Sequence, residues 1–508
     1  MTLNDLRLSA VSARAVSVVF AAEGGKYRLP EPVSWSLWSE GELLREGVTL
    51  QSVLTLTGLG PSQSYTLKSE GGHYLDFHTR NCSGLVDLVD CGADPSGADN
   101  SRAFELAISM VGHGGTLRVP AGRWRTGPVF LKSDMTLLLE QGAVIEANGM
   151  RETWPKLEAR DCNGQVIGSW EGLPDRCYAA VVTAIGASNL VIEGAGTIDG
   201  GGDRSDWWQW PKETRDGARR ARTLHLIGCT NVTLMGLTVR NSPSWTVHPY
   251  RCRDLTASDL TIVNPPDSPN TDGFNPESCE NVLMEGIFFS VGDDCIAIKA
   301  GKRGDGANDH LTPTRNVVIR HCRMERGHGG VVMGSEMSGG IHDVTVEDCE
   351  MEATDRGIRI KTRRGRGGAV SGLRVRRVDM DGVHAALTAN AFYFCDADGH
   401  DDWVQDRAAA EVCETTPSIS DIDIEDVAIR RLSVVAGAFL GLPEAPINGV
   451  RLRNLSVEFD PEAEPAVPLM ADHVRTMRHE LLVAEHADIT CEGANGEPGL
   501  AIAKGVSL

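Results

Sequence analysis

Short runs in which hydrophobic and polar residues alternate occur along the whole chain, and they follow two different arrangements. From residue 1 to about 80, turn residues separate the runs at close, regular intervals. Alternation of period two is the pattern of a strand with one buried face, and several such strands in a short segment predict a β-sandwich. We therefore expect a small β-sandwich domain over residues 1–82. The runs are RAVSVVFAA, VSWSLWSEG, VTLQSVLTLTGL and SYTLKSEG.

From about residue 85 onward a different unit recurs, namely a small polar residue or glycine, an alternating aliphatic run, a turn and a second short run. Most intervals between the nine copies fall in the twenties. Such a period, without a helical 3.6-residue pattern, indicates a solenoid with one repeat per coil, and longer intervals indicate inserted loops. Leucine-rich repeats fit poorly because their LxxLxL pattern is absent. The copies begin at Asn189, Asn231, Asp254, Asn281, Asn316, Asp343, Gly372, Asp421 and Gly449.

These repeats predict a right-handed parallel β-helix over residues 83–508. Residues 100–111 have the pattern of a short helix followed by glycine and a strand. We expect this helix to cover the open end of the solenoid, where the first coil would otherwise expose an unpaired edge. The period is lost after about residue 460, so final turns and a tail are expected there.

The cysteines support the prediction of stacked coils. There are 13 of them with no CxxC pair, which argues against a disulfide framework or a zinc ribbon and favours reduced thiols. Five keep fixed distances from the repeat starts, so they should form interior columns of small buried side chains. Metal ligation or disulfide bonding is less favoured, because stacked side chains point the same way. The five are Cys229, Cys252, Cys279, Cys322 and Cys349.

Composition and charge narrow the class of protein. The 49 Lys and Arg residues against 70 Asp and Glu residues give a formal charge of −21, which argues against a general nucleic-acid-binding protein. No run approaches 18 apolar residues, and the N-terminus lacks a basic flank before an apolar stretch, so we expect neither a membrane span nor a signal peptide. The expected location is the cytoplasm, or the periplasm or cell exterior if a leader has been removed. The oligomeric state is left open.

Four segments between residues 270 and 366 can be superimposed through their strands, and their polar residues then share columns. Asp272 and Asp294 fall in one column, and Asp293 and His328 fall in the next. Neighbouring coils would place Asp272 and Asp294 about 5 Å apart, with Asp293 beside them. The segments are TDGFNP (271–276), GDDCIAIK (292–299), GHGGVVMG (327–334) and DRGIRIKT (355–362).

Three carboxylates crowded together can divide the work of acid and base. Their mutual repulsion raises the pKa of at least one, so one can donate a proton to a leaving group while the others hold a water molecule. This is the division that a glycosidase requires. Arg359 and Lys361, on one face of a strand, would bind an anionic substrate. Solvated turns and a calcium site are the alternatives, and the two cations argue against calcium.

The motifs NTDGFNP, GDDCIAIK, GHGG and RIK, taken together, resemble the four signatures of glycoside hydrolase family 28, the polygalacturonases. The resemblance runs from about residue 85 to about 460. It implies a pectin lyase-like β-helix and inverting hydrolysis of α-1,4-linked galacturonic acid in pectate, without a metal or another cofactor. It also implies that Asp293 is the general acid and that Asp272 and Asp294 activate the attacking water.

The resemblance further implies roles for residues around the carboxylates. His328 would orient or tune the acid, and Arg359 and Lys361 would bind a substrate carboxylate. Asn270, in the first motif, is expected to contact the substrate. Tyr393, in NAFYFC, matches a tyrosine of the family's cleft, although it can equally be a packed core aromatic.

Several features bear on the mode of attack. By the same resemblance, the intact histidine of the GHG motif, His328, favours a substrate with a homogalacturonan backbone. The segment LGPSQSYTL, with Tyr65, resembles the tyrosine corner of fibronectin type III domains, in which the hydroxyl bonds to backbone. Bacterial exo-acting members of the family combine such a domain with the β-helix, and inserts at 150–180 and 383–420 would close an open groove. We therefore expect release of units from the non-reducing end.

Four alternatives to this function remain open at this stage. They are endo-attack, hydrolysis of branched rhamnogalacturonan or xylogalacturonan, a calcium-dependent pectate lyase, and a non-catalytic pectin-binding β-helix.

A tryptophan cluster and an arginine cluster each allow two interpretations. The tryptophans could stack on sugars or form a hydrophobic plug, and the arginines could attract polyanionic pectin or lie in a solvated loop. The residues are Trp207, Trp208 and Trp210, and Arg363, Arg364 and Arg366.

Overall fold

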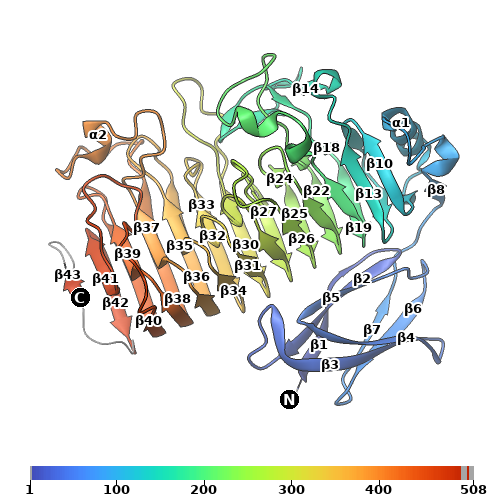
Figure 1. The fold of residues 1–508 in the computed structure, drawn as a ribbon, viewed down its shortest axis with the longest axis horizontal. Helices are drawn as coiled ribbons and strands as arrows, with labels where there is room; N and C mark the ends of the chain where they lie inside the picture. The colour runs from blue at the N-terminus through green and yellow to red at the C-terminus, as the bar shows by residue number, and fades with distance from the viewer. Residues whose placement is uncertain (1–2, 494–499, 503–508) are drawn as a thin grey trace.

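The N-terminal alternating runs form seven antiparallel strands in two small sheets, ordered β1-β2-β5 and β4-β3-β6-β7 (Figure 1). The computed structural model describes residues 3–493 and 500–502. Alternate side chains such as Val18, Phe20, Leu37 and Leu67 form the core between the sheets. The strands are β1 Leu3–Val11, β2 Ala15–Ala22, β3 Arg28–Ser39, β4 Glu42–Gln51, β5 Val53–Thr57, β6 Ser64–Ser69 and β7 Tyr74–His78. The sequence analysis did not predict β1 and β7.

Tyr65 holds the corner of this sandwich. Its hydroxyl accepts a hydrogen bond from the Gly60 N–H at 2.8 Å and donates one to Gln63 Oε1 at 2.7 Å. The ring is buried and stacks on Phe77, with 5.4 Å between the ring centroids. The predicted structural role of this tyrosine is confirmed.

From Leu85 onward the described strands of the coils pair in parallel, and both antiparallel strand pairs lie in an insert. The predicted fold class, a β-sandwich followed by a parallel β-helix, is confirmed. A long sheet runs the length of the helix as two adjacent stacks of strands. Its strands are β8 Leu85–Asp87, β9 Gly115–Val119, β10 Gly122–Thr126, β12 Met135–Leu139, β13 Ala143–Ala147, β19 Ser188–Gly194, β20 Thr197–Asp199, β22 Thr230–Met235, β23 Thr238–Arg240, β25 Arg253–Ser258, β26 Thr261–Val263, β27 Glu280–Glu285, β28 Phe288–Ser290, β30 Thr314–Arg320, β31 Arg323–Glu325, β33 Ile341–Glu347, β34 Glu350–Glu352, β36 Ala369–Asp381, β38 Ser418–Leu432, β40 Ile447–Phe459 and β42 Ala487–Glu492.

A second face of the helix, called here the floor sheet, carries the site. It consists of a four-stranded and a seven-stranded parallel sheet, which Phe274 joins through bridges to Val247 and Ile296. Its strands are β11 Val129–Leu131, β18 Val182–Ile185, β21 Leu224–Ile227, β24 Val247–Tyr250, β29 Ile296–Ile298, β32 Val331–Met333, β35 Arg356–Lys361, β37 Ala385–Asn390, β39 Val435–Leu440, β41 Glu480–Glu485 and β43 Leu500–Ile502.

The residues that begin the repeats explain why the period is visible in the sequence. All nine are Asn, Asp or Gly, and all nine have a positive φ, from 53° at Asn189 to 74° at Gly372. These are the residue types that adopt the left-handed conformation most readily. Their side chains also bond from coil to coil, as from Asn231 Nδ2 to Asn189 Oδ1 at 2.7 Å and from Asn281 Nδ2 to Asp254 Oδ1 at 2.8 Å.

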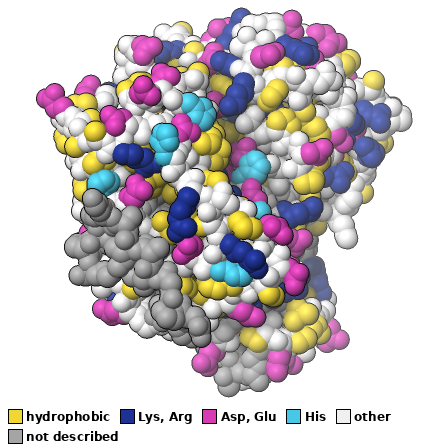
Figure 2. Space-filling view, turned by 60° about the vertical axis from the view of Figure 1, so that its left-hand side comes forward, with side chains coloured by type: hydrophobic (Ala, Val, Ile, Leu, Met, Phe, Trp, Pro, Cys, Tyr) yellow, Lys and Arg dark blue, Asp and Glu magenta, His cyan; other side chains and the backbone are white. Residues whose placement is uncertain are grey.

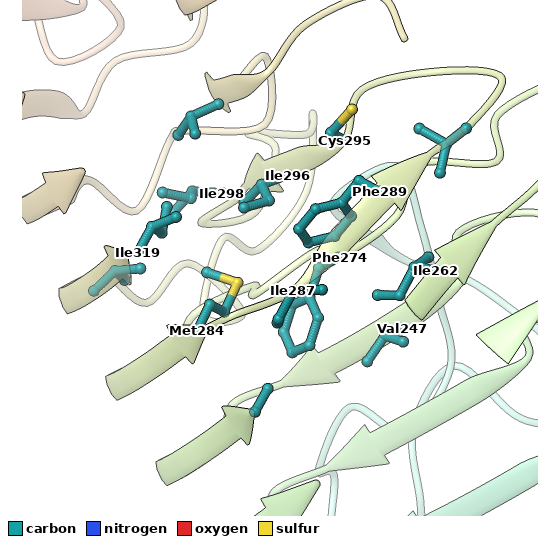
Figure 3. Packing of buried hydrophobic residues seen from close by; sticks show 14 of the residues in the cluster. Val247, Ile262, Phe274, Met284, Ile287, Phe289, Cys295, Ile296, Ile298 and Ile319 are labelled. Atoms are coloured by element: carbon teal, nitrogen blue, oxygen red, sulfur yellow. The ribbon is translucent and has the colours of Figure 1, made fainter. Parts of the chain in front are cut away.

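Inside the coils, aliphatic and aromatic side chains stack along the helix axis, and Phe274, Phe289 and Ile296 belong to this core (Figure 3). The five column cysteines are buried and free, and the Cys252 N–H lies 3.3 Å from Cys279 Sγ. The predicted cysteine columns are therefore confirmed as interior packing.

The ends of the solenoid differ from the repeats between them. Helix α1 (Ser101–Met110) lies within the predicted range and buries Phe104 and Ala107 against the first coils. Beyond residue 460, β41 and β42 continue the coils, and part of the predicted tail, residues 494–499 and 503–508, lies outside the described residues. No helix in the described part of the chain has the length and apolar character needed to span a membrane.

The sandwich packs against the long sheet (Figure 1). Arg7 lies 2.7 Å from Glu285 Oε1, and the Thr55 N–H donates to Asp259 Oδ2 at 2.7 Å. Ala15 packs into a small cluster of buried apolar residues with coil residues of β19 and β22. The two parts of the chain therefore share a partly buried interface on the side of the long sheet.

Candidate active site

The catalytic motifs meet at the floor sheet in the columns that the sequence predicts. The Gly273 N–H donates to the Asp294 carbonyl at 3.0 Å, and the Cys295 N–H donates to the Gly329 carbonyl at 2.8 Å. These ladder bonds place Asp272, Asp294 and Gly329 side by side on consecutive coils. Asp293 and Asp294 occupy the short turn between β28 and β29, so their side chains lie at the edge of the floor.

The glycines of GHGG are required by the close approach of neighbouring coils. Gly327 has a φ of 128°, and a Cβ at this position would lie 2.7 Å from the Asp293 carbonyl oxygen. A Cβ on Gly329 would lie 2.4 Å from Val332 Cγ2. Any larger residue would push the turn that carries His328 away from the two carboxylates.

Asp294 is held by the two cations of β35. Lys361 Nζ donates to Asp294 Oδ2 at 2.6 Å, and an Arg359 guanidinium nitrogen lies 3.7 Å from Oδ1. All three side chains are less than one-tenth exposed. The predicted cations therefore lie directly against one of the predicted carboxylates and supply positive charge next to it.

Asp293 pairs with His328, as their neighbouring columns indicate. His328 Nδ1 lies 3.2 Å from Asp293 Oδ1, and the backbone N–H of Asp294 donates to that same oxygen at 2.9 Å. The hydrogen bond to Asp293 raises the pKa of His328 to about 9, although burial acts against it. Burial of Asp293 would raise the pKa of its carboxyl, but the hydrogen bond and charge of His328 outweigh burial and hold it below its ordinary value.

Asp272 is the carboxyl whose pKa is raised. Burial, reinforced by the negative charge of Asp293, brings it to about 8. Its carboxylate accepts a hydrogen bond from Asn275 Nδ2 at 2.8 Å and lies 3.8 Å from Lys299 Nζ. Burial and the neighbouring carboxylate thus raise one pKa of the cluster, as expected, and the raised pKa belongs to Asp272 while that of Asp293 is lowered.

Sequence reasoning missed the buried ion pair beneath Asp272. Lys299 Nζ lies 2.7 Å from Glu336 Oε2 and 4.5 Å from the ring centroid of Trp245. Burial would raise the pKa of Glu336, but the charge of Lys299 lowers it to about 2. The available signal for Lys299 was its position in the GDDCIAIK motif, two residues beyond Ala297 and on the same outward face of the strand. Glu336 lies after β32, and its place in the sequence gave no such signal.

The two remaining predicted residues also reach the site. Asn270 Oδ1 accepts a hydrogen bond from the buried guanidinium of Arg220. Tyr393 lies beside the two cations, with Lys361 Nζ 5.5 Å and the Arg359 guanidinium carbon 5.7 Å from its ring centroid. It is 9% exposed and lines the pocket, so it is both a packed aromatic and part of the wall.

These side chains line a pocket of about 420 Å³, a volume typical of small-molecule sites. On one face of the molecule, acidic, basic and histidine side chains border a hollow (Figure 2). The pocket is lined by Glu171, Lys212, Trp245, Asn270, Asp272, Asp293, Asp294, Lys299, His328, Ser335, Glu336, Asp355, Arg356, Arg359, Lys361, Tyr393, Cys395, Asp396 and Met470.

An insert covers the floor sheet on the coils that precede Asp272. Insert A, residues 148–181, contains the short strands β14 Lys156–Leu157, β15 Ser169–Trp170, β16 Leu173–Pro174 and β17 Cys177–Tyr178. Beneath it, the outward-facing rings of His225 and His248 stack with 4.6 Å between centroids and are at most 1% exposed. Ile227 and Tyr250, on the same two strands, pack against buried apolar residues of insert A. The groove of an uncovered β-helix is therefore filled on this side.

Two further inserts close the side beyond Arg359. Insert B, residues 391–417, contains α2 (Asp402–Gln405) and is shorter than the predicted 383–420, because residues 385–390 form β37. Insert C, residues 460–479, lies over the floor, where the Met470 carbonyl accepts a hydrogen bond from Asn390 Nδ2 at 3.0 Å. Lys302 joins inserts A and B, since its N–H donates to the Gly172 carbonyl at 2.9 Å and its Nζ lies 2.6 Å from Asp396.

The tryptophan cluster is a hydrophobic plug, as one of its two predicted interpretations states. Trp207 and Trp210 are at most 1% exposed, and Trp207 packs within 5.5 Å of Trp154 and 5.3 Å of Tyr178 between ring centroids. Trp208 donates its Nε1–H to the Ser242 carbonyl at 3.0 Å. The expectation that Trp207 and Trp210 stack on sugars is wrong, because their faces are covered by protein.

Both predictions for the arginine cluster are wrong. Arg363 and Arg366 bond to Asp396 at 3.0 and 2.6 Å, and Arg364 bonds to Glu444 at 2.6 Å. All three arginines are at most 7% exposed. They neither lie in solvent nor offer charge to a polyanion. Arg363 and Arg366 hold insert B through Asp396, and Arg364 holds it through hydrogen bonds to two of its backbone carbonyls.

Comparison with known proteins agrees with the motifs. A family profile described as glycosyl hydrolases family 28 matches residues 132–457. A probable polygalacturonase of Vitis vinifera is 34% identical over 399 residues, which cover 77% of this chain and 78% of that protein. An endo-polygalacturonase of Pectobacterium carotovorum subsp. carotovorum is 30% identical over 353 residues, covering 66% and 80%.

The structure named Yersinia enterocolitica family 28 exopolygalacturonase is 19% identical and superimposes with a TM-score of 0.66 over 99% of this chain and 98% of that one. This likeness shows that the fold is shared along nearly the whole chain, including the N-terminal sandwich. The family profile and the two sequence relatives show more than the fold. The chain is a glycoside hydrolase that belongs to glycosyl hydrolase family 28.

Proposed function

We propose that this chain is an inverting polygalacturonase that acts on homogalacturonan or oligogalacturonides and releases units from the non-reducing end. The observation that carries the exo-acting part is the covered floor sheet. Inserts A, B and C leave a pocket at Asp272, Asp293 and Asp294 in place of a groove that runs past them. A pocket admits a chain end, whereas internal attack needs substrate on both sides of the scissile bond.

In this proposal Asp293 protonates the glycosidic oxygen while Asp272 and Asp294 hold the water that attacks the anomeric carbon. Asp294 Oδ1 is buried and accepts no hydrogen bond in the described structure, so it is available to such a water. The C–O bond breaks as the new one forms, the leaving oxygen takes the proton of Asp293, and the water gives its proton to Asp272 or Asp294.

The raised pKa of Asp272 fits the end of such a cycle. Asp272 and Asp293 interact strongly, so their single proton belongs to the pair rather than to either residue. A proton on Asp272 corresponds to the state in which the water has just been deprotonated, and the raised pKa of Asp272 favours this arrangement of the pair in the substrate-free protein. The cycle closes when the next substrate places its glycosidic oxygen against Asp293 and the proton of the pair is again on that residue.

The positive groups of the pocket match an anionic substrate. Arg359 and Lys361 lie on one side of Asp294 and beside Tyr393. Arg356 is also part of the lining. Guanidinium groups bind carboxylates with two parallel hydrogen bonds, so this side of the pocket would receive the carboxylate of a galacturonate unit. The names of the relatives do not decide the mode of attack, because one is called an endo-enzyme and another an exo-enzyme.

A product time course on polygalacturonate and on trigalacturonate tests the proposal. We expect mono- or digalacturonate from the first time point, almost unchanged viscosity, and the β-anomer as the first product by NMR. Intermediate oligomers with rapidly falling viscosity would show endo-attack, and an α-anomer would contradict inversion. Absence of any product would contradict a homogalacturonan substrate and direct the same assay to branched pectins.

The pH profile should show an alkaline limit. The raised pKa of Asp272, about 8, means that the pair keeps its proton below this pH and loses it above. His328, with a pKa of about 9, loses its charge over the next unit. We therefore expect kcat/KM to fall about tenfold per pH unit above pH 8, measured on trigalacturonate. A profile that is flat to pH 10 would contradict the requirement for this proton.

A further inference from the structure

The tip of a tight hairpin in insert A carries an acidic residue, Glu171, that lines the pocket. Strands β15 and β16 are joined by Glu171 and Gly172, whose φ values are 45° and 80°. A two-residue turn with both φ values positive suits Asn-Gly, and a glutamate in the left-handed region costs energy. Strain of this kind persists where the surrounding structure enforces it, and it concentrates at functional sites.

The hairpin is fixed on both sides of its tip. Three guanidinium groups lie over the buried ring of Trp170, at 5.3 to 5.9 Å from its centroid. A Cβ on Gly172 would lie 2.6 Å from the Lys302 nitrogen and 2.9 Å from Glu336 Cβ, so the turn rests directly on the pocket wall. The backbone that carries Glu171 at the edge of the pocket is therefore held in place by the protein before any ligand binds. The arginines are Arg219, Arg220 and Arg222.

Glu171 differs from the other carboxylates of the pocket in having no partner. Among the described residues that line it, Asp293, Asp294 and Glu336 each bond to a cation, but no hydrogen bond or ion pair holds Glu171. Burial and the nearby charge of Glu336 raise the pKa of Glu171. A partly desolvated acceptor without a partner gains from a hydrogen bond that a ligand donates.

We propose that Glu171 is a specificity-determining residue that accepts a hydrogen bond from the free 4-hydroxyl of the terminal galacturonate. In an α-1,4-linked chain every internal unit uses its 4-oxygen in a linkage, so this donor exists only at the non-reducing end. A carboxylate also repels the carboxylate of the sugar and turns it toward Arg359 and Lys361. The inference rests on the proposed function, because it assigns the chain end to this pocket.

The test compares trigalacturonate with an analogue whose terminal 4-hydroxyl is replaced by hydrogen. The wild-type protein should prefer the natural trimer by about 10- to 100-fold in kcat/KM, the usual effect of a hydrogen bond to a charged group. In Glu171→Asn, kcat/KM on the natural trimer should fall by a similar factor, and the preference should shrink to within about threefold. Glu171→Gln keeps a neutral acceptor of the same length, so its preference should lie between those of Glu171→Asn and the wild type. If Glu171 had a purely structural role, the substitutions would lower kcat/KM equally on both substrates and leave the preference intact.

Two controls separate this effect from folding. Asn is favoured at a positive φ, so Glu171→Asn should unfold at a temperature no lower than the wild type while its shorter side chain withdraws the acceptor. Glu158→Gln removes a carboxylate of the same insert that pairs with Arg176, and it should leave both rates unchanged. If the wild type cleaves from the chain end but Glu171→Asn keeps the full preference for the 4-hydroxyl, the assignment is wrong. If the wild type cleaves no galacturonide, the proposed function itself fails.

Discussion

Asp293→Asn should lower kcat/KM for trigalacturonate by about 10²- to 10⁴-fold, the range that general acid catalysis contributes. Asn has nearly the same shape and can still accept from the Asp294 N–H, but it has no proton to give to the leaving oxygen. The change also removes the negative partner of His328, so the pKa of His328 should fall from about 9 toward its ordinary value near 6.5. Kinetics and an NMR titration of the histidine measure the two effects separately.

An aryl galacturonide with a low-pKa leaving group distinguishes loss of the acid from general damage. Such a leaving group departs without protonation, so Asp293→Asn should lose little activity on this substrate. Asp272→Asn and Asp294→Asn should lose activity on both substrates, since they are assigned to the water. Asp254→Asn is the matched control, because it makes the same change in the turn ladder beside Asn281. Equal losses for Asp293→Asn on trigalacturonate and the aryl substrate would contradict the acid assignment.

The architecture could be predicted because its causes are local and repeated. Each coil needs a residue that accepts a positive φ at the same place, and Asn, Asp or Gly supplies it, as at Asn231 and Asp254. This requirement sets the period, and the period sets the register. Once the register is known, the columns that bring Asp272 beside Asp294 and Asp293 beside His328 follow from strand spacing alone.

The surroundings of the carboxylates could not be predicted in this way. Insert A has no repeat, so nothing in its sequence shows that the hairpin at Glu171 rests on the pocket wall or that His248 lies buried beneath it. Arg364 resembled a solvated charge because its partner, Glu444, is 80 residues away. Long-range pairs of this kind depend on how loops pack across coils, and that packing leaves no periodic signal.

Lys299→Met should destabilise the protein by about 3–5 kcal/mol, the cost of removing one partner of a buried ion pair. The side chains of Lys299 and Glu336 are at most one-tenth exposed, and the Lys299 ammonium lies 2.7 Å from the Glu336 carboxylate. The substitution therefore leaves a buried carboxylate without its cation. The pKa of Glu336 should then rise from about 2, and Asp272 should lose a neighbour that lowers its own pKa. We therefore expect the alkaline limit of kcat/KM to move above pH 8. Urea unfolding and the pH profile measure the two consequences.

The double variant Lys299→Met with Glu336→Met separates stability from catalysis. Apolar residues of similar length can replace a buried pair at little cost, so stability should return to within about 1 kcal/mol of the wild type while the shifted pH limit remains. The wild type should also lose stability as pH falls from about 4.5 toward 2, because the lowered pKa of Glu336 stabilises the folded state only while the group is ionised. The double variant lacks this carboxylate and should lose less stability over that range. If Lys299→Met matches the wild type in stability and in its alkaline limit, Lys299 does not act on Asp272 through a buried ion pair.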